Sequence, residues 1–248
     1  NEDSLAFANE YRAREVLEKY CSFMPVEIFL SKANAEPEYE TIDEADVLDT
    51  DEVVEHITEE PKEGEEGEPK QKAKIVKRPV SLSDIHPLWT KNPSDCTKDD
   101  YIEFYRKVFM DYKEPLFWIH LNMDYPFNLK GILYFPKINT EYDSIEGTIK
   151  LYNNQVFIAD NIKEVIPEFL LLLKGVIDCP DLPLNVSRSA LQNDGFVQKI
   201  SEYISKKVAD KLTGMCKTDR ESYEKYWDDI SPFIKYGCIK DAKLSLIH

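Results

Sequence analysis

The order of β-rich and helical stretches most constrains the fold of this chain. Between residues 117 and 179, short runs rich in β-branched and aromatic residues alternate with turns, whereas beyond Gln192 apolar residues recur every four positions. That recurrence predicts a long amphipathic helix up to Gly214. Its apolar residues are Phe196, Ile200, Ile204, Val208 and Leu212. Mixed strands and helices followed by helices alone predict an α/β layer with a helical extension.

Individual elements follow from local patterns. Residues 116–123 and 129–136 predict an antiparallel strand pair across a proline-containing turn, and residues 147–160 predict one or two further strands. In "IPEFLLLLKG", residues 166–175, a proline near the start and a terminal glycine predict a helix. The following "GVIDC", residues 175–179, predicts a buried strand.

Two segments contain a capping-box pattern, in which a threonine precedes an acidic residue by three positions. Thr97 and Asp100 predict the start of one helix, and Thr218 and Glu221 predict the start of another that stops at Gly237.

The negative charge is concentrated in one segment. The chain has a formal net charge of −16, and Glu36 to Glu68 contains sixteen acidic residues against the single base Lys62. The rest has 31 acidic and 30 basic residues, so the folded body is nearly neutral. A neutral body argues against nucleic-acid binding, which needs a positive face.

Residues 33–72 therefore predict a mobile, acidic hairpin insert, because such a composition rarely offsets the entropy of ordering. We expect a weak helix within residues 43–57, and we expect the strand "MPVEIFL", residues 24–30, to pair with a strand at Ile75 and Val76. Two interpretations of the charge stay open, which are simple solvation and electrostatic tuning of a partner surface.

Several classes of protein lack support in the sequence. Five cysteines, odd in number and without a CxxC pair, indicate reduced thiols in a cytosolic protein, and four scattered histidines predict no metal site. We expect no membrane association, because no apolar run is long enough to span a bilayer and no signal peptide is recognisable. Phosphate-loop, dinucleotide-binding and GxSxG motifs are absent from the sequence.

The stretch "DLPLNVSRSALQ", residues 181–192, places Asn185, Arg188 and Gln192 where a loop becomes a helix. Arg188 and Gln192 are four residues apart and share one helix face. Free N–H groups, the helix dipole and a forked guanidinium would favour an anion such as phosphate there. The alternatives are a surface arginine or a partner for an internal carboxylate, and a plain turn residue at Asn185.

That stretch resembles the middle-domain loop of the heat-shock protein 90 chaperones, and further motifs match the same family in the same order. They are "HPLWTKNPSD", "EFYRKVF", "LYFP", "IKLYNNQVFIAD", "PEFLLLLKGVIDCPDLPLNVSR" and "YEKYWDDISPFIKYG". The "YNNQVF" and "NVSRS" variants resemble the bacterial HtpG type. The acidic segment departs from the bacterial pattern, which has a shorter connection there.

The resemblance implies a three-layer α/β/α middle-domain sandwich with a mixed sheet, followed by a helical extension. Residues 1–192 would form the large subdomain and residues 193–248 the extension. It also implies a fragment that lacks the N-terminal ATPase domain and the dimerisation domain. We therefore expect a monomer from a cytoplasmic homodimer, one that hydrolyses no ATP alone and binds no metal.

The same resemblance implies roles for individual residues. Arg188 would reach the γ-phosphate of ATP when the full-length chaperone closes, while Gln192 and Asn185 would help to place the loop. Clients would be unfolded or partly folded proteins. Trp89 matches a tryptophan implicated in client contact, with a core aromatic as the alternative, and Phe117, Trp118 and Phe127 are further candidates. The family's aromatic loop after "LYFP" is replaced here by "INTEYDSIE".

Two other functions stay open. A DNA-handling transducer domain of the related gyrase and mismatch-repair ATPases would share the fold, but it would use a lysine near the phosphate and a basic surface. A non-catalytic interaction scaffold would use the acidic segment to recruit a partner.

Overall fold

A computed structural model describes residues 5, 8–59, 70–137, 147–161, 165–170, 172–182 and 194–240. The chain divides into two compact units. One unit joins Asn1–Leu17 to Glu27–Leu82, and the other joins Glu18–Val26 to Ser83–His248. The first helix, α1 (Glu10–Cys21), has no buried side chain. No helix within the described ranges is both long and apolar enough to cross a membrane.

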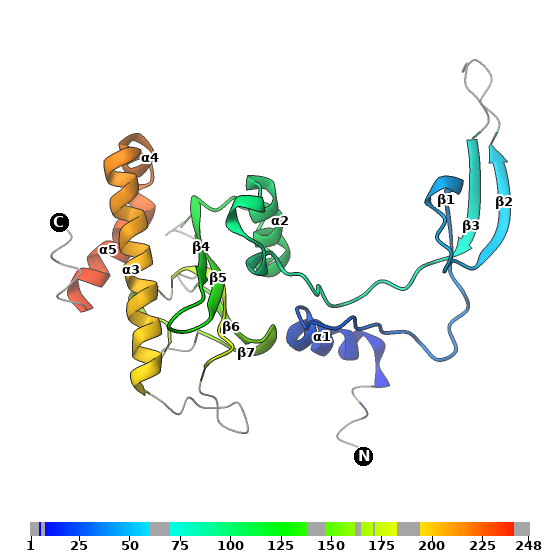
Figure 1. Ribbon diagram of the computed structural model, residues 1–248, viewed down its shortest axis with the longest axis horizontal. Coiled ribbons are helices and arrows are strands. Elements are labelled where there is room, and N and C mark those ends of the chain that lie inside the picture. The colour runs from blue at the N-terminus through cyan, green and yellow to red at the C-terminus, as the bar shows by residue number, and fades with distance from the viewer. Residues whose placement is uncertain are drawn as a thin grey trace. The chain divides into compact units, whose positions relative to one another are not determined.

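A five-stranded mixed sheet forms the centre of the second unit (Figure 1). In spatial order its strands are β4 (Phe117–Met123), β5 (Leu129–Phe135), β8 (Lys174–Asp178), β6 (Ile149–Asn153) and β7 (Val156–Asp160). Strand β8 is antiparallel to β5 and parallel to β6, and the outer pairs are antiparallel. The antiparallel pair and the buried strand expected from the sequence are confirmed.

The two faces of the sheet belong to two separate hydrophobic cores, because successive side chains of a strand point to opposite faces. On β5, Leu133 and Phe135 belong to the first core, whereas Ile132 and Tyr134 belong to the second. All four are fully buried. A strand that is apolar on both sides must be covered on both sides.

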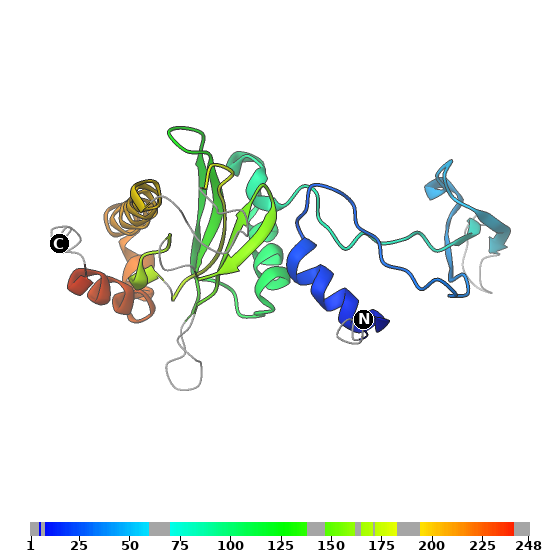
Figure 2. The same ribbon diagram turned by 90° about the horizontal axis from the view of Figure 1, so that it is seen from below.

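Helices supply that cover (Figure 2). On the first face lie α3 (Asp194–Thr218) and α5 (Trp227–Lys240), and on the second lie α2 (Lys98–Phe109) and the 3-10 turn η3 (Leu88–Thr90). This arrangement confirms the three-layer α/β/α fold. The helices after residue 192 share the first core with the sheet, through Val197, Ile200, Ile204 and Val208.

One of the two predicted capping boxes is confirmed. The Asp100 N–H donates to Thr97 Oγ1 at 3.2 Å, and the Thr97 N–H donates to Asp100 Oδ2 at 2.7 Å. The second prediction is wrong, because Asp219 caps α4 (Arg220–Lys225) and the Thr218 hydroxyl bonds back to the carbonyl of Gly214 inside α3.

Two predicted helix ends are also wrong. Helix α3 continues through Gly214, where an added Cβ would meet nothing within 4 Å, and α5 continues through Gly237. The predicted helix over residues 166–175 is replaced by a short 3-10 turn, η5 (Glu168–Leu170), and by the start of β8 at Lys174. A short, wholly apolar run does not distinguish helix from buried strand by its period.

The first unit contains a three-stranded antiparallel sheet where we expected a mobile insert. Its strands lie in the order β1 (Tyr39–Asp43), β3 (Lys70–Val76) and β2 (Val53–Glu59), so the basic strand lies between two acidic ones. The Lys72 ammonium lies 2.5 Å from the Glu59 carboxylate across that pairing. The weak helix expected over residues 43–57 is therefore wrong, because only a single 3-10 turn, η2 (Glu44–Asp46), forms there and strand β2 begins at Val53.

An ion pair closes one end of this sheet. Arg78 donates from Nε and Nη2 to the two carboxylate oxygens of Asp51, at 2.8 and 2.6 Å. The Asp51 side chain is only 4% exposed, and the arginine lowers the pKa of that carboxyl to about 2. Bidentate geometry of this kind is among the stronger charge-assisted contacts in proteins.

The strand predicted over residues 24–30 does not pair with Ile75. That residue pairs with Glu40 on β1 and Val53 on β2. The chain near Ile28 instead runs beside residues 81–82, where the Leu82 N–H donates to the Ile28 carbonyl at 2.7 Å. The two ends of the insert thus lie next to each other, as the two ends of a hairpin do.

Candidate functional site

The three residues expected to contact phosphate, Asn185, Arg188 and Gln192, lie outside the described residues. The structure does describe the chain on both sides of them. Strand β8 leads through Cys179–Leu182 toward this loop, and α3 follows it. The site can therefore be built from the residues that fix where the loop begins.

A buried carboxylate ends the central strand. Asp178 is 6% exposed, and its Oδ2 accepts hydrogen bonds from the Trp89 indole N–H at 3.2 Å and from the Gln155 backbone N–H at 3.0 Å. Trp89 comes from η3 and Gln155 from the turn between β6 and β7. We call Trp89, Gln155 and Asp178 the Asp178 anchor, because the strand end is tied through them to two other elements.

Burial raises the pKa of Asp178, and the hydrogen bonds from Trp89 and Gln155 partly oppose that rise. Asp178 Oδ1 is also buried, and it makes no hydrogen bond to any residue that the structure describes. A buried carboxylate with one satisfied oxygen is held in place at an electrostatic cost. The anchor is therefore sensitive to protonation.

The turn between β6 and β7 holds the next part of the chain. Asn154 and Gln155 have φ values of 50° and 62°, the left-handed pair of a type I′ hairpin turn, which asparagine tolerates well. This turn places the Asn153 amide nitrogen against the carbonyls of Cys179 and Pro180, at 3.1 and 2.9 Å. One side chain thus holds two consecutive carbonyls just beyond the strand.

A second hairpin holds the same stretch at its other end. The Asn128 N–H, from the connection between β4 and β5, donates to Asp181 Oδ2 at 2.9 Å. The Leu182 N–H then donates to the Cys179 carbonyl at 3.2 Å, and the Leu182 side chain is buried. The chain is fixed up to Leu182, six residues before Arg188. The contacts of Asn128, Asn153 and Asp178 thus fix the chain from the end of β8 to Leu182.

The four aromatic residues proposed for client contact lie mostly inside the second unit. Trp89 is 1% exposed, and Phe117 and Phe127 are also buried. Trp118 is half-buried and stacks on Tyr101, with ring centroids 4.8 Å apart. The alternative interpretation of Trp89, a core aromatic residue, agrees with its buried position. Client contact stays a prediction, and of these four Trp118 offers the most accessible surface.

Sequence reasoning missed the residues that form the anchor. Asp178 had one usable signal, since it is a charged residue at the end of an otherwise apolar strand. Asn153 had another, as the first residue of an Asn-Asn-Gln turn between two strands. Neither signal identifies the residue that Asp178 or Asn153 contacts. Trp89 and Asp178, for example, are 89 residues apart in the sequence. Among the described side chains, no group of three or more His, Cys, Asp or Glu is placed to hold a metal ion.

The fold and the anchor define a class of protein: an α/β/α sandwich whose central strand ends at a buried carboxylate held by two other elements. A family model described as Hsp90 protein matches residues 6–245. The chain belongs to the Hsp90 family.

Individual relatives agree with this assignment. A chaperone protein HtpG of Porphyromonas gingivalis is 45% identical over 243 residues, covering 98% of this chain and 31% of that protein. A chaperone protein htpG of Bacteroides fragilis is 43% identical over 239 residues, covering 96% and 30%. Heat shock protein 90-5, chloroplastic, of Arabidopsis thaliana is 32% identical over 253 residues, covering 97% and 30%. The chain thus spans less than a third of the length of these relatives.

Proposed function

We propose that this chain is the middle part of an ATP-dependent chaperone of the HtpG type. It binds unfolded or partly folded proteins, and it supplies Arg188 to the γ-phosphate of ATP held by an N-terminal domain of the whole homodimeric protein. The match to the Hsp90 family over residues 6–245 is the observation that carries this proposal. The names of the bacterial relatives support the chaperone role.

The chemistry of arginine suits this role. A guanidinium stays charged at every physiological pH and presents a planar fork of donors to phosphate oxygens. Arginine fingers in other phosphoryl-transfer systems raise the rate roughly 10³- to 10⁵-fold by stabilising charge on the transferring group. Gln192 and Asn185 would hold the loop around Arg188, and the Asp178 anchor would fix where that loop starts.

Replacing Arg188 in the whole protein tests the proposal. Arg188→Ala should lower ATP turnover by at least about 10²-fold while nucleotide affinity changes little, because the pocket that holds ATP lies in another domain. Arg188→Lys should restore only part of the rate, since an ammonium lacks the planar fork. Steady-state hydrolysis and nucleotide titration measure the two quantities separately.

Arg220→Ala is the matched control. Arg220 is an exposed arginine of α4 whose Nε lies 2.7 Å from Glu224, and its removal should leave turnover unchanged. Full ATPase activity in Arg188→Ala would remove the proposed role of Arg188.

A further inference from the structure

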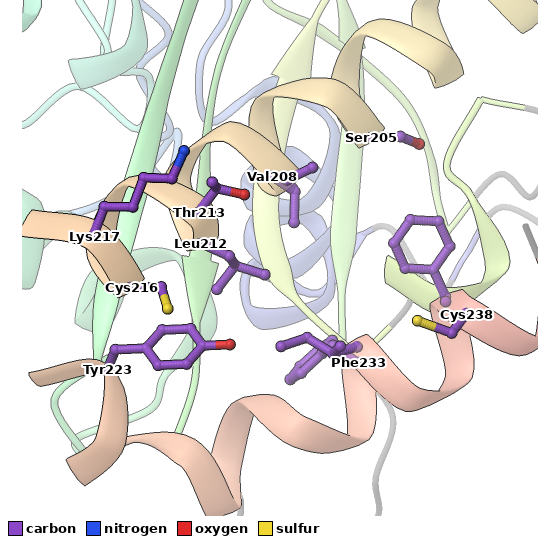
Figure 3. A pocket seen from close by; sticks show the side chains of 13 residues that line it. Ser205, Val208, Leu212, Thr213, Cys216, Lys217, Tyr223, Phe233 and Cys238 are labelled. Atoms are coloured by element: carbon purple, nitrogen blue, oxygen red, sulfur yellow. The ribbon is translucent and has the colours of Figure 1, made fainter. Parts of the chain in front are cut away.

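A cavity of about 190 Å³ lies within the helical layer of the second unit. Figure 3 shows that side chains from α3, α4 and α5 surround it, and η5 contributes Phe169. Native helix packing leaves few voids larger than a water molecule. This cavity is partly open to solvent, and its size within the helical layer calls for an explanation.

Small residues line the space on two of the helices. They are Ala209 of α3 and Gly237 of α5, and a larger side chain at either position would reduce the volume. The walls around them are mainly apolar, formed by Val208, Leu212 and Phe233 among others. Apolar walls of this kind favour an apolar occupant over water.

Four of the residues that line the cavity carry a hydroxyl or an ammonium group, namely Ser205, Thr213, Lys217 and Tyr223. The Ser205 hydroxyl already donates to the Ser201 carbonyl of its own helix, at 2.9 Å. The Tyr223 hydroxyl points into the space in Figure 3, and it makes no hydrogen bond within the described part of the chain. A tyrosine hydroxyl is protonated at neutral pH, and burial raises the pKa of Tyr223 further, so the hydroxyl is a donor.

Two thiols mark opposite ends of the cavity. Cys216 comes from the last turns of α3, and Cys238 comes from α5 (Figure 3). Both are partly exposed, and neither forms a disulfide. They provide chemical handles by which occupancy of the cavity can be followed.

We propose that this cavity binds a small molecule consisting of one aromatic ring with a single hydrogen-bond acceptor, which accepts from the Tyr223 hydroxyl. An apolar cavity of roughly 150 Å³ in another protein takes up benzene, so this volume holds a ring with one substituent. The apolar walls bind the ring, and Tyr223 distinguishes ligands by their acceptor. This site is separate from the Arg188 loop and goes beyond the proposed chaperone role.

Two probes and two substitutions test the site in the intact chain. The probes are p-cresol, whose oxygen can accept a hydrogen bond, and toluene, which has none. Tyr223→Phe should weaken p-cresol binding about three- to tenfold, the effect of one lost hydrogen bond, and should leave toluene binding within about twofold. Ala209→Leu should abolish binding of both probes by filling the space. The matched control is Lys206→Leu, which makes the same kind of change on an exposed position of α3 and should bind both probes normally.

A second measurement uses the unmodified chain and needs no substitution. It follows how far a bound probe protects the two thiols from a thiol reagent. Bound p-cresol should slow the reaction of N-ethylmaleimide with Cys216 and Cys238 at least about threefold, measured by peptide mass spectrometry. Cys21 and Cys96, which do not line the cavity, should react at unchanged rates. The proposal is overturned if neither probe binds, as when another part of the protein fills the space. It is equally overturned if binding survives Ala209→Leu, or if both thiols react unprotected.

Discussion

Asp178 ties the end of strand β8 to two other elements of the second unit. Its Oδ2 accepts two hydrogen bonds, from Trp89 and from Gln155, in a place that excludes water. Removing a buried acceptor leaves its donors unsatisfied, which costs more than the net energy of the bonds themselves. Asp178 therefore contributes both to the stability of the sheet and to the position of the chain beyond it.

Substitutions at Asp178 should separate its charge from its hydrogen bonds. Asp178→Ala leaves two buried donors without an acceptor and should lower the free energy of unfolding by about 2–5 kcal/mol. Asp178→Asn keeps an oxygen that can accept both bonds and should cost far less. Urea unfolding measures both effects. An alanine variant as stable as the unmodified chain would contradict the anchoring role.

The pH dependence of the same variants has a definite sign. Burial raises the pKa of Asp178 in the folded chain, so the folded state binds a proton more tightly than the unfolded state does. Its contribution to stability is fully present below the ordinary pKa of 3.8 and is lost as pH rises through the raised value. The stability of the unmodified chain relative to Asp178→Asn should therefore fall as pH rises from about 4.

At the scale of elements, two glycines show opposite requirements. Gly175 lies in the central strand β8, where an added Cβ would be 2.7 Å from the Ile132 carbonyl oxygen and 2.8 Å from Leu133 Cδ2. Gly214 lies inside α3, where an added Cβ would meet nothing within 4 Å. The first glycine is required by close packing, whereas the second only weakens its helix.

Alanine at each position should therefore change stability in opposite directions. Gly175→Ala forces the sheet apart and should cost about 1–3 kcal/mol. Gly214→Ala lowers the entropy of the unfolded chain and should add about 0.5–1 kcal/mol. Chemical denaturation of the two variants side by side measures the contrast. Equal effects of the two substitutions would show that backbone entropy, not packing, governs both.

At the scale of the whole molecule, the acidic insert has its own sheet and its own ion pairs. The two ends of the insert meet where the Leu82 N–H donates a hydrogen bond to the Ile28 carbonyl. We call this meeting point the stem of the insert. Residues on either side of such a stem can be joined by a short turn at little entropic cost. The folding of the second unit should thus be independent of the insert.

Replacing residues 30–80 by a short turn should leave the second unit cooperatively folded, with a free energy of unfolding that is unchanged or slightly higher. Urea unfolding followed by tryptophan fluorescence measures this, since all three tryptophans lie in the second unit. As a control, Arg78→Ala removes the bidentate pair with Asp51 and should disturb only the sheet of the insert. Non-cooperative unfolding of the shortened chain would show that the insert supports the second unit.

Local patterns predicted most of the second unit. The strand pair, the strand β8, helix α3 and the Thr97 capping box depend on residues a few positions apart, and each is confirmed. The sheet of the insert could not be predicted in this way. Its acidic strands are stabilised by the basic strand β3 between them, and composition alone treats each charge run as separately solvated.

The residues of the candidate site also differ in whether a local sequence pattern indicates them. The sequence pattern and the family resemblance single out Arg188, which lies outside the described residues, so its role stays a prediction. The Asp178 anchor could not be predicted in this way, because Trp89, Gln155 and Asp178 meet only after three elements have packed. The cavity was equally invisible, since it results from the spacing of α3 and α5.

The contact between Trp89 and Asp178 also gives the chain a built-in optical reporter. An indole fluoresces according to its surroundings, and this one donates its N–H to a buried carboxylate at the end of strand β8. With Trp118 and Trp227 replaced by phenylalanine, Trp89 would be the sole tryptophan of this chain. Its emission would then report, in real time and without an attached dye, any change in the surroundings of the Asp178 carboxylate.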